Sequence, residues 1–311
     1  MLSFGIDTSN YTTSVAWYDS DSGEYIQNRR LLSVRKGETG LRQSDAVFKH
    51  TIQLPEIMLE VEDGKRKVPD VIAVSVAPRD AEGSYMPCFA VGKCVAQTAG
   101  ALFGVPVLQF SHQAGHIAAA LVSAGRLDLL DCEFIAFHVS GGTTEAVLVE
   151  PDSEKIMKIT LIASSLDLHA GQAVDRVGNM LGLSFPAGKE MDELGRKSDK
   201  EFKIHPFMKD NSCSLSGIEN KCREMINNAA SPEDTAKFCI CYIMAALEKM
   251  TDGLRSEYPG LPVVYSGGVM SNSLIRERFT KKYGAVFAKN GFSSDNALGT
   301  AVLGAIAGGK K

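Results

Sequence analysis

The sequence predicts an α/β protein built from two duplicated lobes. Strand-like and helix-like segments alternate along the chain, as in sheets flanked by helices. The opening IDTSNYTTSVAW (6–17) returns as HVSGGTTEAVL (138–148), with Ser9 aligned to Ser140. Two hairpins with polar turns can look alike by chance, but the elements that follow also recur, which favours duplication. The 311 residues are enough for about two domains, and we place the lobes at 1–107 and 108–311.

The first lobe is predicted to open as an antiparallel meander. FGIDTS, SVAWYD and YIQNRRLL supply its three strands, and a helix follows over about 44–62. VIAVSVA (71–77) is a buried strand because of its β-branched content. The helix VGKCVAQTAGALFG ends at Gly104, a natural C-cap, and VPVLQF is the next strand.

The second lobe is predicted to open with the helix SHQAGHIAAALVSAG and to repeat the pattern from Glu133. FIAFHVSGG, TTEAVLVEP and IMKITLIAS are strands, and helices cover about 171–183 and 232–257. VVYSGG (263–268) is a buried strand that leads into a helix. The tail DNALGTAVLGAIAGG forms a final helix, about 295–309, which we expect to pack back at the lobe junction.

Charge and composition exclude several classes of protein. The net charge of −4 provides no global basic field for nucleic acid, so any such contact needs a local patch. No apolar run approaches the roughly 20 residues that span a membrane, and the chain begins in a strand pattern rather than a signal peptide. The seven cysteines include no C-x-x-C pair and indicate reduced thiols. We therefore expect a cytoplasmic protein with no membrane contact.

Three turns of small polar residues predict a nucleotide site. They are DTSN (7–10), VSGGTT (139–144) and YSGGV (265–269), and FPAGKEMDELG (185–195) adds a glycine turn before an acidic helix start. Such turns present backbone N–H groups and hydroxyls to phosphate oxygens. A single glycine pair is usually only a turn. Three turns, two of them at duplicated positions, favour a nucleotide held between the lobes.

Two histidines in SHQAGH predict a metal site. His112 and His116 are four residues apart and therefore share one face of a helix. Asp295, in GFSSDNALG, stands before the last helix, where a carboxylate is either an N-cap or a third ligand. Two imidazoles and a carboxylate with open positions suit iron(II) or zinc, and the residues do not choose between these metals.

The same residues argue against a peptidase. The zinc-protease motif H-E-x-x-H needs a glutamate base after the first histidine, and Gln113 occupies that position. The chain also has no G-x-S-x-G elbow for a serine hydrolase. A kinase would need an aspartate base aimed at its substrate, which the sequence does not identify.

The motifs together resemble the glycoprotease-like family of tRNA threonylcarbamoyladenosine transferases, in the actin-like ATPase superfamily. GIDTS resembles the family's G-I-E-T-S, SHQAGHIAA its H-x-x-G-H metal motif, and HVSGGTTE its V-S-G-G-H-T turn. AGQAVDRVGNMLGLSFPAGK resembles its A-G-E-A-F-D-K-x-x-x-L-G-L-x-Y-P-G-G segment without gaps. SLSGIEN, YSGGVMSN and SSDNA match three further motifs in order. The resemblance implies two actin-like (ribonuclease-H-like) lobes around a nucleotide and metal cleft.

The resemblance also implies a reaction and a site. The family moves threonylcarbamoyl from its adenylate to N6 of adenosine 37 in tRNA, releases AMP, and works with other subunits of a tRNA-modification complex. The implied cofactors are a divalent metal, iron or zinc, and an ATP- or AMP-type nucleotide. The implied metal ligands are His112, His116 and Asp295. The implied nucleotide contacts are Thr8, Asn10, Ser140, Gly141, Gly142, Asp175, Gly188 and Asn272.

The chain departs from the family pattern at groups around the substrate. The family's C-D-E-T is Asn10-Tyr11-Thr12-Thr13 here, so both acidic side chains are gone. Thr143 and Gln172 replace a histidine and a glutamate, and APRDAEGSYMP (77–87) replaces a shorter loop. No catalytic residue is assigned for this reason. The alternative function is a catalytically altered paralogue that serves as a nucleotide-binding partner or acts on another acceptor.

Overall fold

The computed structural model describes residues 1–9, 11–33, 41–61, 68–289, 292 and 297–309. Contacts divide the chain into two compact units. The first comprises Met1–Cys132, Glu150–Ile159 and Gly291–Lys311, and the second comprises Glu133–Val149 and Thr160–Asn290.

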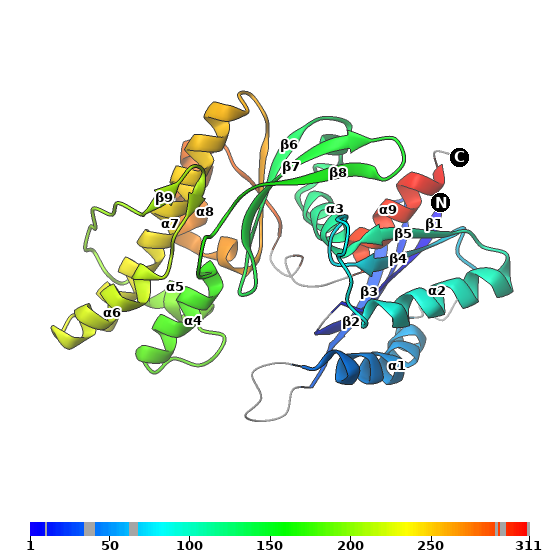
Figure 1. Cartoon of the computed structure of the whole chain (residues 1–311), viewed down its shortest axis with the longest axis horizontal. Coiled ribbons are helices and arrows are strands. Elements are labelled where there is room, and N and C mark those ends of the chain that lie inside the picture. The colour runs from blue at the N-terminus through cyan, green and yellow to red at the C-terminus, as the bar shows by residue number, and fades with distance from the viewer. Residues whose placement is uncertain (10, 34–40, 62–67, 290–291, 293–296, 310–311) are drawn as a thin grey trace. The chain divides into compact units, whose positions relative to one another are not determined.

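The sheet of the first unit has the order β3-β2-β1-β4-β5. β1 (Leu2–Asp7), β2 (Thr12–Asp19) and β3 (Tyr25–Leu31) form the predicted antiparallel meander. β4 (Val71–Ala77) and β5 (Val107–Ser111) then add in parallel on the other side of β1. The chain therefore carries the ends of β1, β4 and β5 to the same edge of the sheet (Figure 1).

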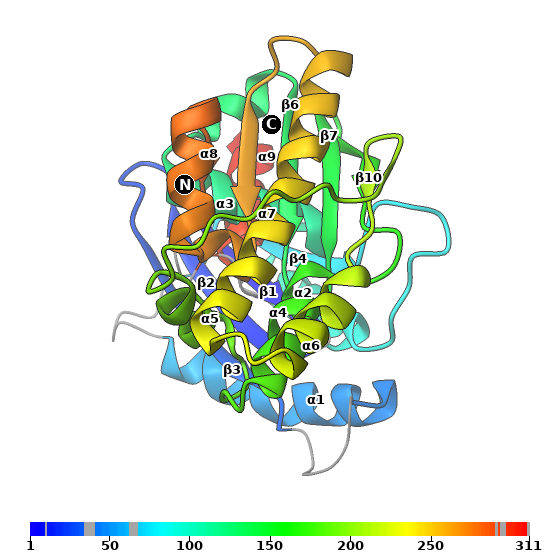
Figure 2. The same ribbon diagram turned by 90° about the vertical axis from the view of Figure 1, so that its left-hand side faces the viewer.

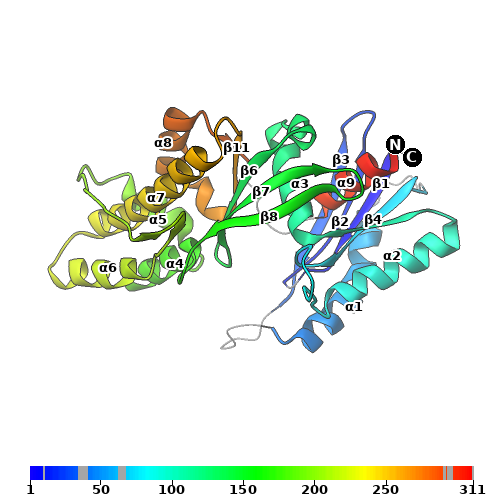
Figure 3. The ribbon, with the colours of Figure 1, turned by 45° about the horizontal axis from the view of Figure 1, so that its top comes forward.

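Helices cover both faces of this sheet (Figure 3). α1 (Gln43–Glu60) and α2 (Phe89–Phe103) bury one face, where Phe4, Val15 and Leu54 belong to one apolar cluster. α9 (Leu298–Gly309) covers the other face and packs on both β1 and α3 (His112–Ala124). α2 ends at Gly104 in the left-handed conformation, as the sequence predicts.

The sheet of the second unit has the order β12-β11-β6-β7-β8. β6 (Phe134–Val139), β7 (Thr144–Asp152) and β8 (Ile156–Ser164) follow one another, and β6 and β7 are antiparallel. β11 (Val263–Ser266) and β12 (Val286–Phe287) continue in parallel beyond β6. Both sheets thus consist of three consecutive strands extended by two parallel strands, which is the architecture expected of duplicated lobes.

The helices of the second unit pack around α7 (Pro232–Glu257), as Figure 2 shows. Its neighbours are α4 (Ala170–Met180), α5 (Gly188–Gly195), α6 (Gly217–Asn227) and α8 (Ser273–Tyr283).

Three short elements complete the described structure: η1 (Leu127–Asp131), η2 (Gly268–Ser271) and the hairpin of β9 (Met208–Lys209) with β10 (Ser212–Cys213). Tyr265 is fully buried and stacks on Phe137 with ring centroids 5.0 Å apart.

The division into units differs from the predicted lobes 1–107 and 108–311. That boundary falls inside β5 and assigns α3 and α9 to the second lobe, whereas both helices group with the first unit. The physical reason is packing, because α9 lies against β1, β2 and β4 and holds α3 with it. The position of the last helix at a lobe junction stays a prediction. None of the described helices is long and apolar enough to cross a membrane.

Glycines allow α9 to approach its neighbours at backbone distance. A Cβ on Gly299 would lie 1.8 Å from the carbonyl oxygen of Gly115 in α3, and one on Gly5 would lie 2.5 Å from the carbonyl oxygen of Ala297. No side chain fits in either gap. A Cβ on Gly115, the glycine of SHQAGH, would lie 2.8 Å from Oγ1 of Thr300 in α9, so this glycine also serves the helix crossing.

We expect Gly299→Ala to lower the free energy of unfolding by about 1–3 kcal/mol, because the added methyl forces α9 away from α3. Gly309→Ala is the matched control in the same helix, since a Cβ there meets nothing within 4 Å. Denaturant unfolding monitored by circular dichroism measures both changes. Equal stability of the two variants would contradict the close crossing.

Candidate functional site

The two histidines of SHQAGH lie together at the start of α3. The side chain of Ser111 caps this helix by accepting from the backbone N–H of Ala114 at 3.2 Å, so the helix begins at His112. The ring centroids of His112 and His116 are 4.3 Å apart. Both imidazoles therefore lie on one face of α3, as their spacing predicts.

A buried carboxylate holds the first histidine in place. Nδ1 of His112 lies 2.9 Å from Oδ2 of Asp7, and Ser9 donates its hydroxyl to the same oxygen at 3.2 Å. Asp7 is only 1% exposed, and its other oxygen, Oδ1, has no hydrogen-bond partner among the described residues. Asp7 belongs to the predicted turn DTSN (7–10), but no separate role for its carboxylate was predicted. The signal that could have found Asp7 is its position in the opening motif. Its partner in the structure is a histidine 105 residues away in the sequence.

The third expected metal ligand, Asp295, lies outside the described residues. Within the described part of the chain, no group of three or more histidine, cysteine, aspartate or glutamate side chains is placed to hold a metal ion. The described residues do bring the start of α9 to the histidines. Gly299 packs against Gly115, the residue directly before His116.

A second set of predicted residues surrounds the turn after β6 in the second unit. The backbone N–H of Ser140 donates to the carbonyl of Thr143 at 2.7 Å and closes the turn. Gly141 and Gly142 are exposed, with open space where side chains would stand. These two residues therefore leave backbone groups accessible to a ligand.

The N-terminus of α4 packs directly against this turn. A Cβ on Gly171 would lie 2.6 Å from the backbone nitrogen of Gly141, and the Gly171 N–H donates to the carbonyl of Ser140 at 3.1 Å. The N–H of Ala170 donates to Oγ1 of Thr144 at 2.8 Å. The positive end of a helix thus lies beside the glycine turn, as in many phosphate sites.

Two further predicted residues lie in α4 and at the start of α5. Oδ1 of Asp175 accepts from the backbone N–H of Ala187 at 2.9 Å and so ties α4 to the start of α5. Gly188, the first residue of α5, is exposed, and a Cβ there would meet nothing within 4 Å. One oxygen of Asp175 is therefore used structurally.

Asn272 is the N-cap of α8. Its Oδ1 accepts from the N–H groups of Leu274 at 3.1 Å and Ile275 at 3.2 Å. Asp192 in α5 accepts from the Ser273 hydroxyl at 2.8 Å, which binds the start of α8 to α5.

Gly267, with φ of 101°, lies against the backbone of Val139, so the turn after β11 adjoins the turn after β6. The second unit therefore gathers six predicted residues around its glycine turns: Ser140, Gly141, Gly142, Asp175, Gly188 and Asn272.

The structure describes Thr8, one of the two nucleotide residues predicted in the opening motif. Thr8 is buried, and its hydroxyl donates to the carbonyl of Cys88 at 3.0 Å and accepts from the N–H of Gly92 at 3.1 Å. Its side chain thus fastens the end of β1 to the start of α2. Asn10 lies outside the described residues.

A buried polar cluster lies behind the opening motif. Oγ1 of Thr13 lies 2.8 Å from Nδ1 of His50 and 3.0 Å from Oε1 of Gln53. His50 is fully buried, and its Nε2 has no hydrogen-bond partner among the described residues. Burial lowers the pKa of His50 to about 4, and the negative charge of Asp7 opposes this shift only in part. The ring is therefore neutral at pH 7.

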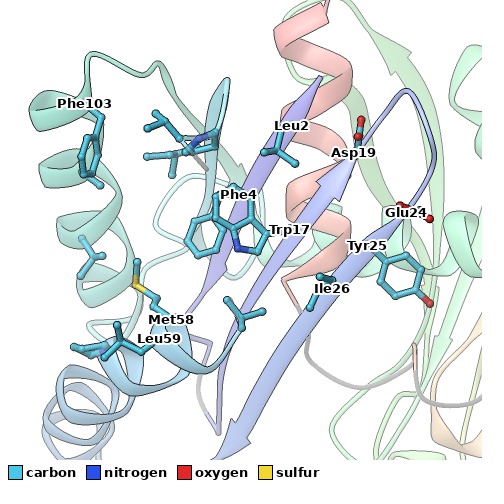
Figure 4. A pocket seen from close by; sticks show the side chains of 17 residues that line it. Leu2, Phe4, Trp17, Asp19, Glu24, Tyr25, Ile26, Met58, Leu59 and Phe103 are labelled. Carbon is cyan, nitrogen blue, oxygen red and sulfur yellow. The ribbon is translucent and has the colours of Figure 1, made fainter. Parts of the chain in front are cut away.

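An apolar pocket of about 850 Å³ is also present in the first unit (Figure 4). Leu2, Phe4, Trp17, Tyr25, Met58 and Phe103 are among its lining residues. Asp19 and Glu24 supply its charged groups, so it is unsuited to a polyanionic nucleotide. The nucleotide residues named above do not line it.

Comparisons with known proteins agree with the motifs. The sequence model of a family described as TsaD, tRNA N6-adenosine threonylcarbamoyltransferase, matches residues 48–302. The tRNA N6-adenosine threonylcarbamoyltransferase of Persephonella marina (strain DSM 14350 / EX-H1) is 29% identical over 292 residues, covering 90% of this chain and 80% of that protein. That of Sulfurihydrogenibium sp. (strain YO3AOP1) is 28% identical and covers 90% and 82%.

Solved structures share the fold. Full-length HypF in its phosphate- and nucleotide-bound form has a TM-score of 0.60 at 14% identity, over 99% of this chain and 55% of that one. The ROK hexokinase from Thermus thermophilus has a TM-score of 0.57 at 13% identity, with 100% of both chains covered. At these identities the likeness concerns the fold alone, and it confirms the predicted actin-like architecture.

The buried His50 predicts a pH-dependent stability. Its pKa is about 4 in the folded chain and 6.5 in the unfolded chain, so the unfolded state binds the proton more tightly. Its contribution is complete above pH 6.5 and is lost as the pH falls towards 4, a loss of roughly 3 kcal/mol.

His50→Gln keeps a polar side chain that does not titrate, so we expect a flatter pH dependence for this variant between pH 6.5 and 4. Urea unfolding of both proteins at a series of pH values measures the difference. Parallel curves for the two proteins would show that His50 is not held neutral by burial.

Proposed function

The chain belongs to the family of the tRNA N6-adenosine threonylcarbamoyltransferases, and from this premise we propose that it transfers threonylcarbamoyl from its adenylate to N6 of adenosine 37 in tRNA. The observation that carries the proposal is the histidine pair on α3, which lies within the matched region and whose ring centroids are 4.3 Å apart. A tRNA substrate and free cysteine thiols are consistent with a cytoplasmic protein.

The proposed metal ligands are His112, His116 and Asp295. The described residues fit such a group, because Asp7 accepts from one ring nitrogen of His112 and directs the other towards a ligand. In the sequence, Asp295 precedes Gly299 by four residues. Gly299 contacts Gly115 between the histidines, so the described start of α9 lies beside the pair, which supports this ligand set. The nitrogen and oxygen donors suit iron(II) or zinc.

When bound, the metal supplies a Lewis acid that polarises and orients the carbamoyl group. The chain's own contribution is to hold the two imidazoles in fixed positions. The N-cap of Ser111 sets the first turn of α3, and the contact between Gly115 and Gly299 fixes the face from which α9 approaches. Fixed positions align the reacting group before the reaction begins.

The proposed nucleotide contacts are Ser140, Gly141, Gly142, Asp175, Gly188 and Asn272, with Thr8 and Asn10 from the opening motif. The open backbone at Gly141, Gly142 and Gly188 supports this assignment, as do the helix starts of α4 and α8. The positive ends of these two helices stabilise the phosphate of an acyl-adenylate and of the AMP that leaves. The acceptor tRNA and other subunits of a modification complex remain proposed partners.

The second candidate function is an altered paralogue, which acts as a nucleotide-binding partner or on another acceptor. The observation that favours it lies in the opening motif, where Tyr11 and Thr12 replace the family's two acids; Thr12 is buried, and Tyr11 is 37% exposed. Thr13, which matches the family's threonine, bonds inward to His50 and Gln53. Gln172 accepts from the backbone N–H of His169 at 3.3 Å, so this replacement also serves the fold.

Complementation separates the two candidate functions. A host depleted of its own transferase is supplied with the wild-type chain, with His112→Ala, or with Lys221→Ala, an exposed surface control. We expect wild type and the control to restore threonylcarbamoyladenosine in tRNA, measured by mass spectrometry of nucleosides, and His112→Ala to fail. Soluble wild-type protein that restores none would favour the altered paralogue.

A further inference from the structure

Asp7 makes a contact that neither the expected ligand set nor the nucleotide turns explain. We propose that Asp7 is a positioning residue that accepts a hydrogen bond from Nδ1 of His112, so that a metal ion binds this ring through Nε2. The proposal rests on the proposed metal function of His112 and His116. It adds a residue to that site and states which ring nitrogen binds.

The hydrogen bond defines the tautomer. Nδ1 of His112 lies 2.9 Å from Oδ2 of Asp7. An ionised carboxylate only accepts, so Nδ1 must carry the proton. A neutral imidazole has one N–H, so in the neutral ring Nε2 is the nitrogen that carries the lone pair. A metal ion needs that lone pair, and a second hydrogen bond from the ligating ring to a carboxylate is typical of metal-bound histidines.

The surroundings make the pair rigid. Asp7 is the last residue of β1, which is the central strand of a five-stranded sheet, and it pairs with Ser14 of β2. Gly5, two residues earlier, lies beneath the start of α9. The ring of Phe89 lies 6.1 Å from that of His112, between centroids. Neither the carboxylate nor the imidazole can turn away without disturbing packed neighbours.

Burial makes the contact strong. Asp7 is 1% exposed and the His112 side chain is 19% exposed. Water screens such a pair far less than it screens a surface pair. Oδ1 of Asp7 is also buried, with no hydrogen-bond partner among the described residues. Buried acceptors are rarely left unsatisfied, so this oxygen is available to a donor that arrives with the metal or the substrate.

The matched variants are Asp7→Asn and Ser14→Ala. Asparagine keeps the volume of Asp7 but has an amide that can donate to Nδ1, which stabilises the other tautomer. Ser14→Ala perturbs the same strand pair without touching the carboxylate, since its hydroxyl makes only a 3.4 Å bond to the Asp7 carbonyl. The metal affinity of Asp7→Asn is expected to be about 10–100-fold weaker than that of wild type. That of Ser14→Ala is expected to be unchanged.

Two measurements on the full chain test the proposal. Long-range ¹H–¹⁵N NMR of the metal-free protein at pH 8 reports which nitrogen of His112 is protonated, with His112→Ala to assign the signal. We expect Nδ1 in the wild type and an increased share of Nε2 in Asp7→Asn. Zn²⁺ affinity, measured by competition with a chromophoric chelator, gives the second readout.

A wild-type His112 protonated at Nε2 overturns the proposal, even if Asp7→Asn does not fold. A folded Asp7→Asn with wild-type tautomer and wild-type Zn²⁺ affinity also overturns it. Failure of the proposed metal function is a different result. In that case the wild-type chain and His112→Ala bind Zn²⁺ equally weakly, while the NMR signal still reports the tautomer.

Discussion

The close approach of α9 to β1 and α3 is the constraint on which the first unit depends. Three glycines permit it, because Gly5, Gly115 and Gly299 leave no room for a side chain between backbones. The crossing closes one face of the sheet and fixes α3 relative to the end of β1. His112 at the start of α3 then meets Asp7 at the edge where the parallel strands end. A packing requirement and a chemical site therefore share the motif SHQAGH.

The second unit uses close backbone contact in a different way. Gly171 and Gly267 bring the start of α4 and the turn after β11 against the turn after β6. Gly141 and Gly142 leave that turn open to solvent. Glycines that pack and glycines that stay exposed thus lie side by side. This combination distinguishes the proposed phosphate cradle from an ordinary tight turn.

Much of this fold can be predicted from the sequence. The meander of the first three strands, the helix that ends at Gly104 and the long helix over 232–257 all follow from local patterns, and all are confirmed. α6 was not predicted, because it buries only a narrow apolar face. Its buried residues are Ile218 and Cys222. The boundary at 107/108 could not account for α9, which returns to the first sheet from the end of the chain. Such a return depends on long-range packing rather than on local propensity.

The candidate site was predictable in its residue types but not in its connections. The spacing of His112 and His116 indicated a shared helix face, and the ring separation confirms it. Asp7 was not identified, because nothing in a strand end shows that its carboxylate will meet a histidine 105 residues away. The bonds of Thr8 and Asp175 to backbone groups were equally hidden. The hydrogen bonds of these side chains are structural, so a ligand can bind only the polar atoms that these bonds do not use.

The central claim is that His112 and His116 form a metal centre oriented by Asp7. Anomalous diffraction at the zinc edge, from crystals of the full chain loaded with Zn²⁺, tests it most directly. The account predicts a peak about 2.0–2.2 Å from Nε2 of His112, from a nitrogen of His116 and from a carboxylate oxygen of Asp295, with Asp7 still bonded to Nδ1. A peak elsewhere, or coordination through Nδ1 of His112, would contradict it.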